Sequence, residues 1–504
     1  MAEARIVIDP EFEVGEIDRR LFGSFVEHLG RCVYDGIYEP GHPTADADGF
    51  RTDVLDLVRE LGVSTIRYPG GNFVSGYRWE DGVGPQDQRP TRLDLAWHST
   101  ETNEFGLHEF ARWAQVAGVE PMMALNLGTR GVLDALDLLE YSNVAAGSSL
   151  AERRIANGAQ DPFGINMWCL GNEMDGPWQL GHCSADDYGK LASQTAKGMR
   201  QLDPSVQLVA CGSSSRSMPT FGSWEKTVLR HTYDDVDFIS CHAYYEERDG
   251  DLGSFLAAAV DMDRFIESVV AVADSVGAEL KRDKLINISF DEWNVWYQQR
   301  DRDKNTITGL DNWPKAPRIL EDVYNVTDAV VVGNLLISLL RHADRVKAAS
   351  LAQLVNVIAP IMTEPGGPAW RQSTFFPFAE TAKRAVGSSL RLRIDSDQYD
   401  TPRFGAVNSV DAAASHDQEQ DSTSVFLVNR DHQQTSTVAL DVAALPGRSV
   451  QEAYVIADSD RLAANTAEQT DRVGLQPLDD VQTEGDRIQL SLPPLSWSVV
   501  TLGQ

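Results

Sequence analysis

The segment WCLGNEMDGPWQLG, residues 168–181, contains an apolar run that stops at a glycine and continues at once into polar residues. The run that begins at Asn166 is typical of a buried strand, and Gly171 ends it. Asn172 and Glu173 would then lie at the carboxyl end of that strand. A solvated glutamate at an ordinary strand end gives the same pattern, so this segment alone leaves the chemistry open.

A second segment of the same kind follows later in the chain. INISFDEWN, residues 286–294, is another apolar run that leads to a glutamate, Glu292, flanked by aromatic residues. Enzymes that cleave glycosidic bonds require two carboxyl groups, one of which protonates the departing oxygen. The presence of both Glu173 and Glu292 therefore favours a catalytic pair over two solvated strand ends.

Strand-like segments alternate with amphipathic helical segments over residues 20–375. Val54, Leu57, Val58 and Leu61, for example, form one apolar face of a helix. The expected strands are residues 21–27, 64–68, 121–127, 166–170, 207–211, 237–242, 285–290 and 348–355. Eight such repeats predict an α/β fold, the (β/α)8 TIM barrel. A doubly wound sheet is the alternative, but no GxGxxG motif follows an early strand.

The pattern changes after residue 378 to short, β-branched or alternating segments between polar turns. These segments predict an all-β sandwich over residues 379–504. Residues 1–17 also contain two strand-like segments, which we expect to complete the sandwich because an isolated pair of strands is only marginally stable. The catalytic barrel would then cover residues 18–378. Two acidic stretches poor in aromatic residues, 409–423 and 458–483, are predicted to be exposed loops.

Composition and charge narrow the classes of partner. The 504 residues carry a net charge of −31, with an isoelectric point near 4.6, which argues against nucleic acid and anionic membranes as partners. The chain shows neither a secretory signal nor a long apolar run that could cross a membrane. Its five cysteines include no CxxC pair. Free thiols and a cytoplasmic location are the simplest interpretation, and we expect neither a metal nor a cofactor.

In a TIM barrel, functional groups gather beyond the carboxyl ends of the strands. The residues predicted at those ends are mostly acids, amides and aromatics: Glu27, His28, Asn72, Asn126, Asn172, Glu173, Ser213, Tyr244, Glu292, Trp296, Gln353 and Asn356. Carboxylates and amides bind sugar hydroxyls, and aromatic rings cover the C–H faces of sugars. His28 and His242 could be metal ligands, but hydrogen-bonded supports are the more frequent role of such histidines. Gly70 and Gly71 are interpreted as turn residues.

Several long blocks of the sequence resemble one known family. The blocks are FGSFVEHLGRCVYDGIYEP (22–40), IRYPGGNFVSGYRWEDGVGP (66–85), WHSTETNEFGLHEF (97–110), LGNEMDGPWQLGH (170–182), DEWNVWY (291–297), LLRHADRVKAASLAQLVNVIAPI (339–361) and WRQSTFFPF (370–378). In this order they resemble the α-L-arabinofuranosidases of glycoside hydrolase family 51. The resemblance covers residues 20–378 densely and the remainder more loosely.

The resemblance implies a TIM barrel with a jelly-roll-like C-terminal domain, and a retaining, exo-acting enzyme. By motif, Glu173 would be the acid/base and Glu292 the nucleophile. Substrate would be bound by Glu27, Asn72, Asn172, Tyr244 and Gln353, with Trp296 on the side of the leaving group. The implied substrates are arabinose-containing oligosaccharides, and the implied assembly is a homohexamer built as a trimer of dimers.

Two alternatives to this activity remain open. A barrel with two carboxyl groups does not by itself fix the sugar, so a β-xyloside or a β-glucan could be the substrate. A sugar-binding barrel that has lost catalysis is the alternative from a different class, although the presence of both Glu173 and Glu292 argues against it.

Overall fold

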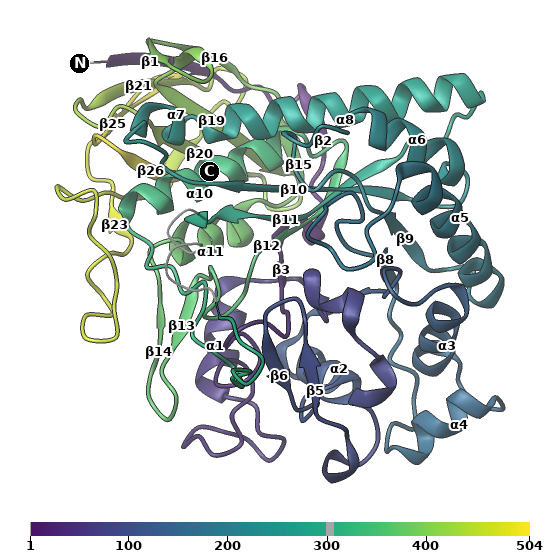
Figure 1. The fold of residues 1–504 in the computed structure, drawn as a ribbon. Coiled ribbons are helices and arrows are strands. Elements are labelled where there is room, and N and C mark those ends of the chain that lie inside the picture. Colours follow the sequence, from purple (N-terminus) through teal and green to yellow (C-terminus); the bar gives the residue numbers. More distant parts are fainter. Residues whose placement is uncertain (1, 299–306, 504) are drawn as a thin grey trace.

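The computed structural model describes residues 2–298 and 307–503. Eight parallel strands form a closed barrel at its centre (Figure 1). In order around the barrel they are β3 (Gly23–Phe25), β4 (Thr65–Tyr68), β7 (Glu120–Ala124), β8 (Met167–Leu170), β9 (Gln207–Ala210), β10 (Phe238–Tyr245), β11 (Asn287–Val295) and β12 (Val346–Leu351). Strand β12 pairs with β3 and closes the circle. The predicted TIM barrel is confirmed.

Every connection between successive barrel strands contains at least one helix. The helices are α1 (Thr52–Leu61), α2 (Leu107–Ala117), α3 (Val132–Asn143), α4 (Ser149–Ala156), α5 (Ala185–Leu202), α6 (Ser223–Thr232), α7 (Leu252–Leu256), α8 (Ala258–Leu280), α10 (Val326–Arg341) and α11 (Phe375–Arg384). The apolar face predicted for residues 54–61 is buried in α1, which ends at Gly62 with φ +76°. Two short hairpins extend the loops: β5 (Arg92–Asp94) with β6 (Ser99–Glu101), and β13 (Ile361–Thr363) with β14 (Ala369–Arg371).

Two barrel strands extend further than the sequence predicts. We expected them to end at residues 242 and 290, whereas β10 continues to Tyr245 and β11 to Val295. The register of both strands is irregular near these positions. In β10 the irregularity lies between Ser240 and His242, and in β11 it lies between Phe290 and Trp293. The apolar pattern stops where buried polar side chains begin, although the backbone ladder continues through them. As a result, Tyr244 and Glu292 lie within strands and not beyond their ends.

The C-terminal region consists of two antiparallel-rich sheets packed face to face, and the predicted all-β domain is confirmed. One sheet has the order β16 (Arg393–Ser396), β1 (Ala2–Val7), β21 (Ser436–Asp441), β25 (Arg487–Leu492), β24 (Val481–Glu484). The other has the order β2 (Glu13–Glu16), β15 (Ser388–Leu390), β19 (Val410–Asp417), β20 (Ser422–Asn429), β26 (Ser496–Gly503), β22 (Ser449–Ile456), β23 (Gln476–Pro477). A separate ribbon joins β17 (Gln398–Thr401) to β18 (Gly405–Asn408). The two N-terminal strands each belong to one sheet.

The prediction of an exposed loop over residues 409–423 is wrong. Most of this segment is the buried strand β19, which pairs with β15 and β20. Its polar residues misled the prediction because their charges are neutralised inside the structure. Asp411 accepts hydrogen bonds from Asn334 (2.8 Å) and Arg430 (2.7 Å) and forms an ion pair with Arg341. The second predicted loop, residues 458–483, is right only in part: residues 458–475 contain neither helix nor strand, but β23 and the start of β24 lie in the remainder.

Helix α10 joins the barrel to the C-terminal domain. Nearly all of its residues are buried, and it contacts α8 and α11 of the barrel as well as β19, β20 and β26. Gly333 allows the close approach, since a Cβ atom there would lie 2.1 Å from the ring of Trp497. A helix that is apolar all round is stable only when it is buried on every side, which is the position of α10.

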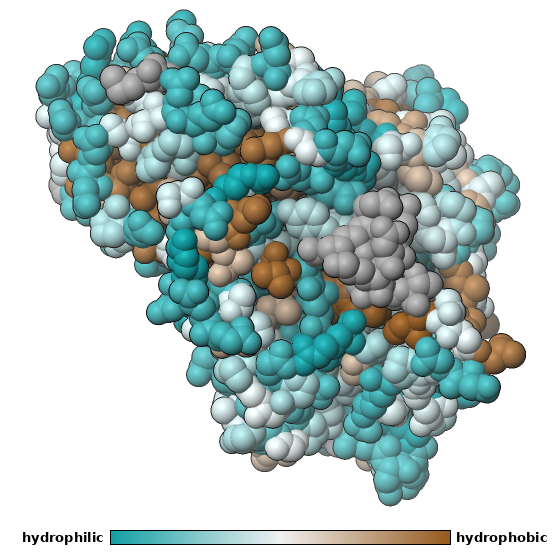
Figure 2. All heavy atoms as spheres, turned by 60° about the vertical axis from the view of Figure 1, so that its left-hand side comes forward, coloured by the Kyte–Doolittle hydropathy of each residue, from teal (hydrophilic) through white to brown (hydrophobic). Residues whose placement is uncertain are grey.

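The surface reflects the acidic composition of the chain. Hydrophilic residues cover most of the face drawn in Figure 2, and hydrophobic residues appear there in small, separate groups. Among residues 2–298 and 307–503, no helix combines the length and apolar character that crossing a membrane requires.

The buried charges at the contact between α10 and β19 predict a strong effect on stability. Burial opposes ionisation of Asp411, but Arg341 and Arg430 hold its pKa below the ordinary value. Asp411→Ala would leave the buried Arg430 without its counter-charge and Arg341 with Asp263 alone, and breaking a buried pair in this way typically costs about 3–5 kcal/mol. We expect the melting temperature to fall by several degrees, whereas Asp400→Ala, on exposed strand β17, should change it little. Equal melting temperatures for the two variants would contradict this account.

Candidate active site

Glu292 is held at the centre of the barrel by two donors from neighbouring strands. The side chain is 5% exposed. Arg67, on β4, donates from Nη1 to Oε1 at 2.8 Å, and the hydroxyl of Tyr244, on β10, donates to Oε2 at 2.7 Å. Both carboxylate oxygens therefore have a donor that favours the ionised form.

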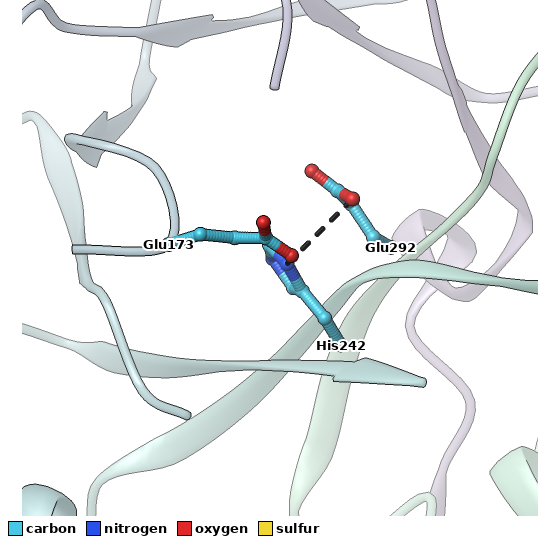
Figure 3. Close-up of side chains that lie close together, drawn as sticks. All are labelled: Glu173, His242 and Glu292. Atoms are coloured by element: carbon cyan, nitrogen blue, oxygen red, sulfur yellow. Dashed lines mark hydrogen bonds and ion pairs between the residues drawn. The ribbon is translucent and has the colours of Figure 1, made fainter. Parts of the chain in front are cut away.

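Glu173 faces Glu292 across the barrel from the end of β8. It has φ +42°, a left-handed conformation that is uncommon for a residue with a side chain. Trp178 donates from Nε1 to its Oε2 at 2.6 Å, and Nδ1 of His242 lies 2.9 Å from its Oε1. Figure 3 shows the side chains of Glu173, His242 and Glu292 pointing toward one another, and one side-chain atom of each lies within 4.8 Å of the others.

His242 connects the two glutamates to a third carboxyl group. Its Nδ1 is 3.6 Å from Glu292 Oε2, and its Nε2 is 2.8 Å from Asp291 Oδ1. Burial opposes a charge on the imidazole, but Glu292, Asp291 and Glu173 outweigh it and raise the pKa of His242 well above its ordinary value. Burial likewise opposes ionisation of Asp291, yet Arg67 and His242 keep its pKa low. His242 is therefore an imidazolium that donates toward a carboxyl group on each side, Glu173 and Asp291.

The two facing glutamates influence each other's protonation. Burial raises the pKa of Glu292, His242 lowers it, and the charge of Glu173 raises it again. The outcome is a pKa above the ordinary value. Two carboxyl groups this close cannot both ionise freely, so the pair retains a proton at a pH where exposed carboxyls would have lost theirs.

Glu27 forms a second acidic position beside this pair. Its Oε1 accepts hydrogen bonds from Phe73 N and Trp97 Nε1, both at 2.9 Å, and Gln353 Nε2 lies 3.0 Å from Oε2. Burial raises the pKa of Glu27 to about 8, against the opposing effect of the Phe73 and Trp97 donors. Glu27 is therefore protonated at neutral pH.

The asparagines and aromatic residues complete the arrangement. Asn172 accepts from Arg67 Nη2 at 2.7 Å and points its amide nitrogen toward Asn72 Oδ1, at 3.4 Å. The ring of Trp296 meets that of Tyr244 edge to face, with centroids 5.1 Å apart. Gly71 lies so close that a Cβ atom would come within 3.1 Å of Glu292. The two glycines before Asn72 thus make room for the carboxyl groups, beyond the turn role expected of them.

A cavity of about 720 Å³ opens above these groups. Seven of the eight predicted site residues line it: Glu27, Asn72, Glu173, Tyr244, Glu292, Trp296 and Gln353. The eighth, Asn172, is 1% exposed and lies behind the cavity wall on Arg67. A cavity lined by carboxyls, amides and aromatic rings suits a sugar.

Several residues that shape this site were not predicted from the sequence. Arg67 is the clearest example of a residue that was not predicted. The only sign of it in the sequence was a charged side chain within the apolar segment TIRY. Asp291 was read only as part of an apolar run. Trp97 and Trp178 both line the cavity, and they donate to Glu27 and Glu173, respectively. His28 is a buried support. Its Nδ1 lies 2.8 Å from Glu101 Oε2, and its Nε2 lies 2.8 Å from the Tyr68 hydroxyl.

Within the described part of the chain, one set of side chains has the spacing of metal ligands. It is the same trio, Glu173, His242 and Glu292. One imidazole and two carboxylates could ligate a divalent cation such as zinc. The hydrogen bonds among these groups, together with those from Arg67 and Trp178, account for their proximity without one.

Comparison with known proteins places this site in a family. The family model of the α-L-arabinofuranosidase 1 domain matches residues 57–251, and that of the α-L-arabinofuranosidase C-terminal domain matches residues 291–496. An exo-α-(1→6)-L-arabinofuranosidase of Bifidobacterium longum is 58% identical over 99% of this chain and 97% of its own. An intracellular exo-α-(1→5)-L-arabinofuranosidase of Streptomyces lividans is also 58% identical, over 99% of this chain and 75% of its own.

Solved structures agree with these relatives. A family 51 α-L-arabinofuranosidase from Bifidobacterium longum superimposes with a TM-score of 0.96, at 49% identity, over all of both chains. An α-L-arabinofuranosidase from Thermotoga maritima, solved as an arabinose complex, gives a TM-score of 0.87 at 32% identity over 99% of each chain. With identity this high along nearly its whole length, the chain belongs to the α-L-arabinofuranosidases of glycoside hydrolase family 51.

Proposed function

We propose that this protein is a retaining, exo-acting α-L-arabinofuranosidase that releases terminal non-reducing α-L-arabinofuranosyl residues from arabino-oligosaccharides in two displacement steps. The observation that carries the proposal is the pair Glu173 and Glu292, which face each other in one cavity with oxygens within 4.8 Å. Retaining glycosidases place their carboxyl groups about 5–5.5 Å apart, whereas inverting enzymes leave a wider gap for water.

In the first step, Glu292 attacks the anomeric carbon of the arabinofuranosyl ring. A bond forms between that carbon and a carboxylate oxygen of Glu292, and the bond to the leaving oxygen breaks. Arg67 and Tyr244 hold the attacking carboxylate in place. Glu173 transfers its proton to the leaving oxygen. We assign to Glu173 the proton that the pair of facing glutamates retains, and His242, with Nδ1 2.9 Å from Glu173 Oε1, holds the acid in place.

In the second step, water replaces the leaving group. Glu173, now ionised, takes a proton from the water molecule. At the same time, the oxygen of that water attacks the anomeric carbon. The bond to Glu292 breaks, and arabinose leaves with the configuration of the substrate. The same carboxyl group thus serves as acid in the first step and as base in the second.

The remaining residues would hold the sugar ring. Glu27, protonated because its pKa is about 8, can donate a hydrogen bond to a ring hydroxyl while Asn72 and Gln353 supply amide groups beside it. Asn172 acts from behind the wall by fixing Arg67 and Asn72. Trp296 would cover the side of the leaving group. A pocket of this kind admits a chain end, which supports exo action.

The proposal also covers the cellular location, the natural substrate and the oligomeric state of the enzyme. Relatives from Streptomyces lividans and Bacillus subtilis are named intracellular exo-α-(1→5)-L-arabinofuranosidases. We propose a cytoplasmic enzyme that acts on short imported oligosaccharides and assembles as a homohexamer, a trimer of dimers. A β-xyloside or a soluble β-glucan is the alternative substrate.

The choice of sugar can be tested directly. We expect the enzyme to hydrolyse nitrophenyl α-L-arabinofuranoside at least tenfold faster than the corresponding β-xyloside, and to leave a soluble β-glucan intact. On arabinan, free arabinose should appear before the viscosity falls, because only chain ends enter the cavity. Preferred hydrolysis of the xyloside, or a viscosity that falls before monosaccharide appears, would refute the proposed specificity or the exo action.

The two glutamates should respond differently to truncation. Glu292→Ala should lower turnover of every arabinoside by on the order of 10⁴-fold, because the covalent step is lost. Glu173→Ala should lower turnover of natural arabinosides by roughly 10²–10⁴-fold and that of aryl arabinosides with acidic phenols much less. Azide should then restore the Glu173→Ala enzyme and yield an arabinosyl azide of retained configuration. An inverted azide, or equal losses on both substrate types, would show that the roles are assigned wrongly.

The protonation of Glu27 predicts a dependence of stability on pH. With a pKa raised from 4.5 to about 8, folded Glu27 keeps a proton that the unfolded chain releases, so the folded state loses stability as pH rises through that window. Glu27→Gln removes the titrating group. Its melting temperature relative to wild type should therefore rise between pH 5 and pH 9, while Glu11→Gln, at an exposed position, should show no such trend. A constant difference for Glu27→Gln would mean that Glu27 is ionised at neutral pH.

A further inference from the structure

The walls of the catalytic cavity come from two halves of the barrel. Glu27, Asn72 and Gln353 follow β3, β4 and β12, which are neighbours in the barrel. Glu173 follows β8, and the cavity wall beyond it comes from the loops after β8, β9 and β10. That wall consists of Trp178, Ser214, Ser215, Ser217, Met218 and Arg248. Because Glu173 must lie within hydrogen-bond distance of the leaving oxygen, the leaving sugar has to extend toward this second wall.

The serine-rich segment in that wall is fixed by backbone hydrogen bonds. The amide of Gly212 donates to Ser240 Oγ at 3.0 Å, and the amide of Ser213 donates to Glu225 Oε1 at 2.8 Å. The amide of Ser214 donates to Asp175 Oδ2 at 3.0 Å, and its hydroxyl lies 3.1 Å from the same oxygen. Three successive amides are thus bound to side chains, so the loop presents its hydroxyls from a rigid support.

Asp175 links this loop to the acid/base residue. It lies two positions after Glu173, is 9% exposed, and has no role in the two displacement steps. Through Asp175, the segment that positions the proton donor also positions Ser214. Ser215 and Ser217 continue the wall, with their hydroxyl oxygens 2.9 Å apart. Arg248 stands at the edge with its Nε bound to Glu246 at 2.9 Å. Hydroxyls, a guanidinium and the Trp178 ring are the groups that bind a second sugar.

We propose that residues 212–217, held by Asp175, form the subsite for the leaving sugar and select among arabinosides by binding its hydroxyl groups. The proposal rests on the proposed α-L-arabinofuranosidase activity and adds Ser214 and Ser215 as specificity-determining residues, with Asp175 as a positioning residue. The ligand class is a hydroxyl-rich sugar attached through the bond that is cleaved.

Two substrates with the same kind of leaving oxygen distinguish a loss of binding to the leaving sugar from a loss of catalysis. The α-(1→5)-linked arabinofuranosyl disaccharide and methyl α-L-arabinofuranoside both release an alkoxide that needs a proton from Glu173, but only the disaccharide carries hydroxyls for residues 212–217. The readout is the ratio of their kcat/KM values. In Ser214→Ala and Ser215→Ala we expect this ratio to fall five- to tenfold, mainly through KM for the disaccharide, as is usual when one hydrogen bond is lost.

The Asp175 variants test the support. Asp175→Ala should lower the same ratio, and Asp175→Asn, which keeps an acceptor for the Ser214 amide, should restore most of it. The matched control is the exposed pair Asp203 and Ser205, which makes the same two contacts at 3.0 and 2.6 Å far from the cavity. Ser205→Ala should leave the ratio unchanged.

The outcomes distinguish this inference from the activity on which it rests. A wild-type ratio in both Ser214→Ala and Ser215→Ala would overturn the subsite, as would equal losses on the two substrates. If the wild-type enzyme cleaves neither arabinoside, the proposed function itself fails and the subsite fails with it.

Discussion

The structure depends on the placement of Arg67 among buried carboxyl groups. Its guanidinium binds Glu292 and Asn172, lies 4.0 Å from Asp291, and stands over the ring of Phe25. Arg67 and His242 are the cations that bond directly to the buried acids at this end of the barrel. The carboxyl groups gathered around them are Glu27, Glu173, Asp175, Asp291 and Glu292. Five carboxyls cannot all ionise against two cations in a buried site, so some must hold protons.

Because positive charge is scarce, some of these carboxyl groups are ionised and others are protonated, and the proposed reaction needs both kinds. Asp291 and Glu292 are nearest to Arg67 and have donors on their oxygens, so they take the negative charge. The groups that donate to Glu27 belong to Phe73, Trp97 and Gln353, none of which is a cation, and burial raises the pKa of Glu27 to about 8. Burial also raises the pKa of Asp175, to about 6. In the proposed mechanism, this one arrangement of charges separates the nucleophile from the proton donor and leaves a neutral acid to hold the sugar.

The sequence predicted more of the catalytic pair than of its surroundings. Glu173 and Glu292 end apolar runs, which is a local signal, and the eight-fold alternation of strands and helices predicted the barrel that brings them together. The only local signal for Arg67 was a charge inside an apolar strand, and Asp291 had none, because a charge inside a strand becomes reasonable only when its partners from distant strands are known. The same limit explains the wrong prediction of a loop over residues 409–423. An aspartate such as Asp411 favours a loop unless its buried partners, here Arg341 and Arg430, are known.

The central claim is that Glu292 forms a covalent bond to the sugar, which makes the reaction proceed with retention. Proton NMR of the wild-type enzyme acting on an aryl α-L-arabinofuranoside in the presence of methanol tests it most directly, since the anomer formed first can be seen before mutarotation. The account predicts that α-L-arabinofuranose and methyl α-L-arabinofuranoside appear first. Initial formation of the β anomer, with no methyl glycoside of retained configuration, would contradict it.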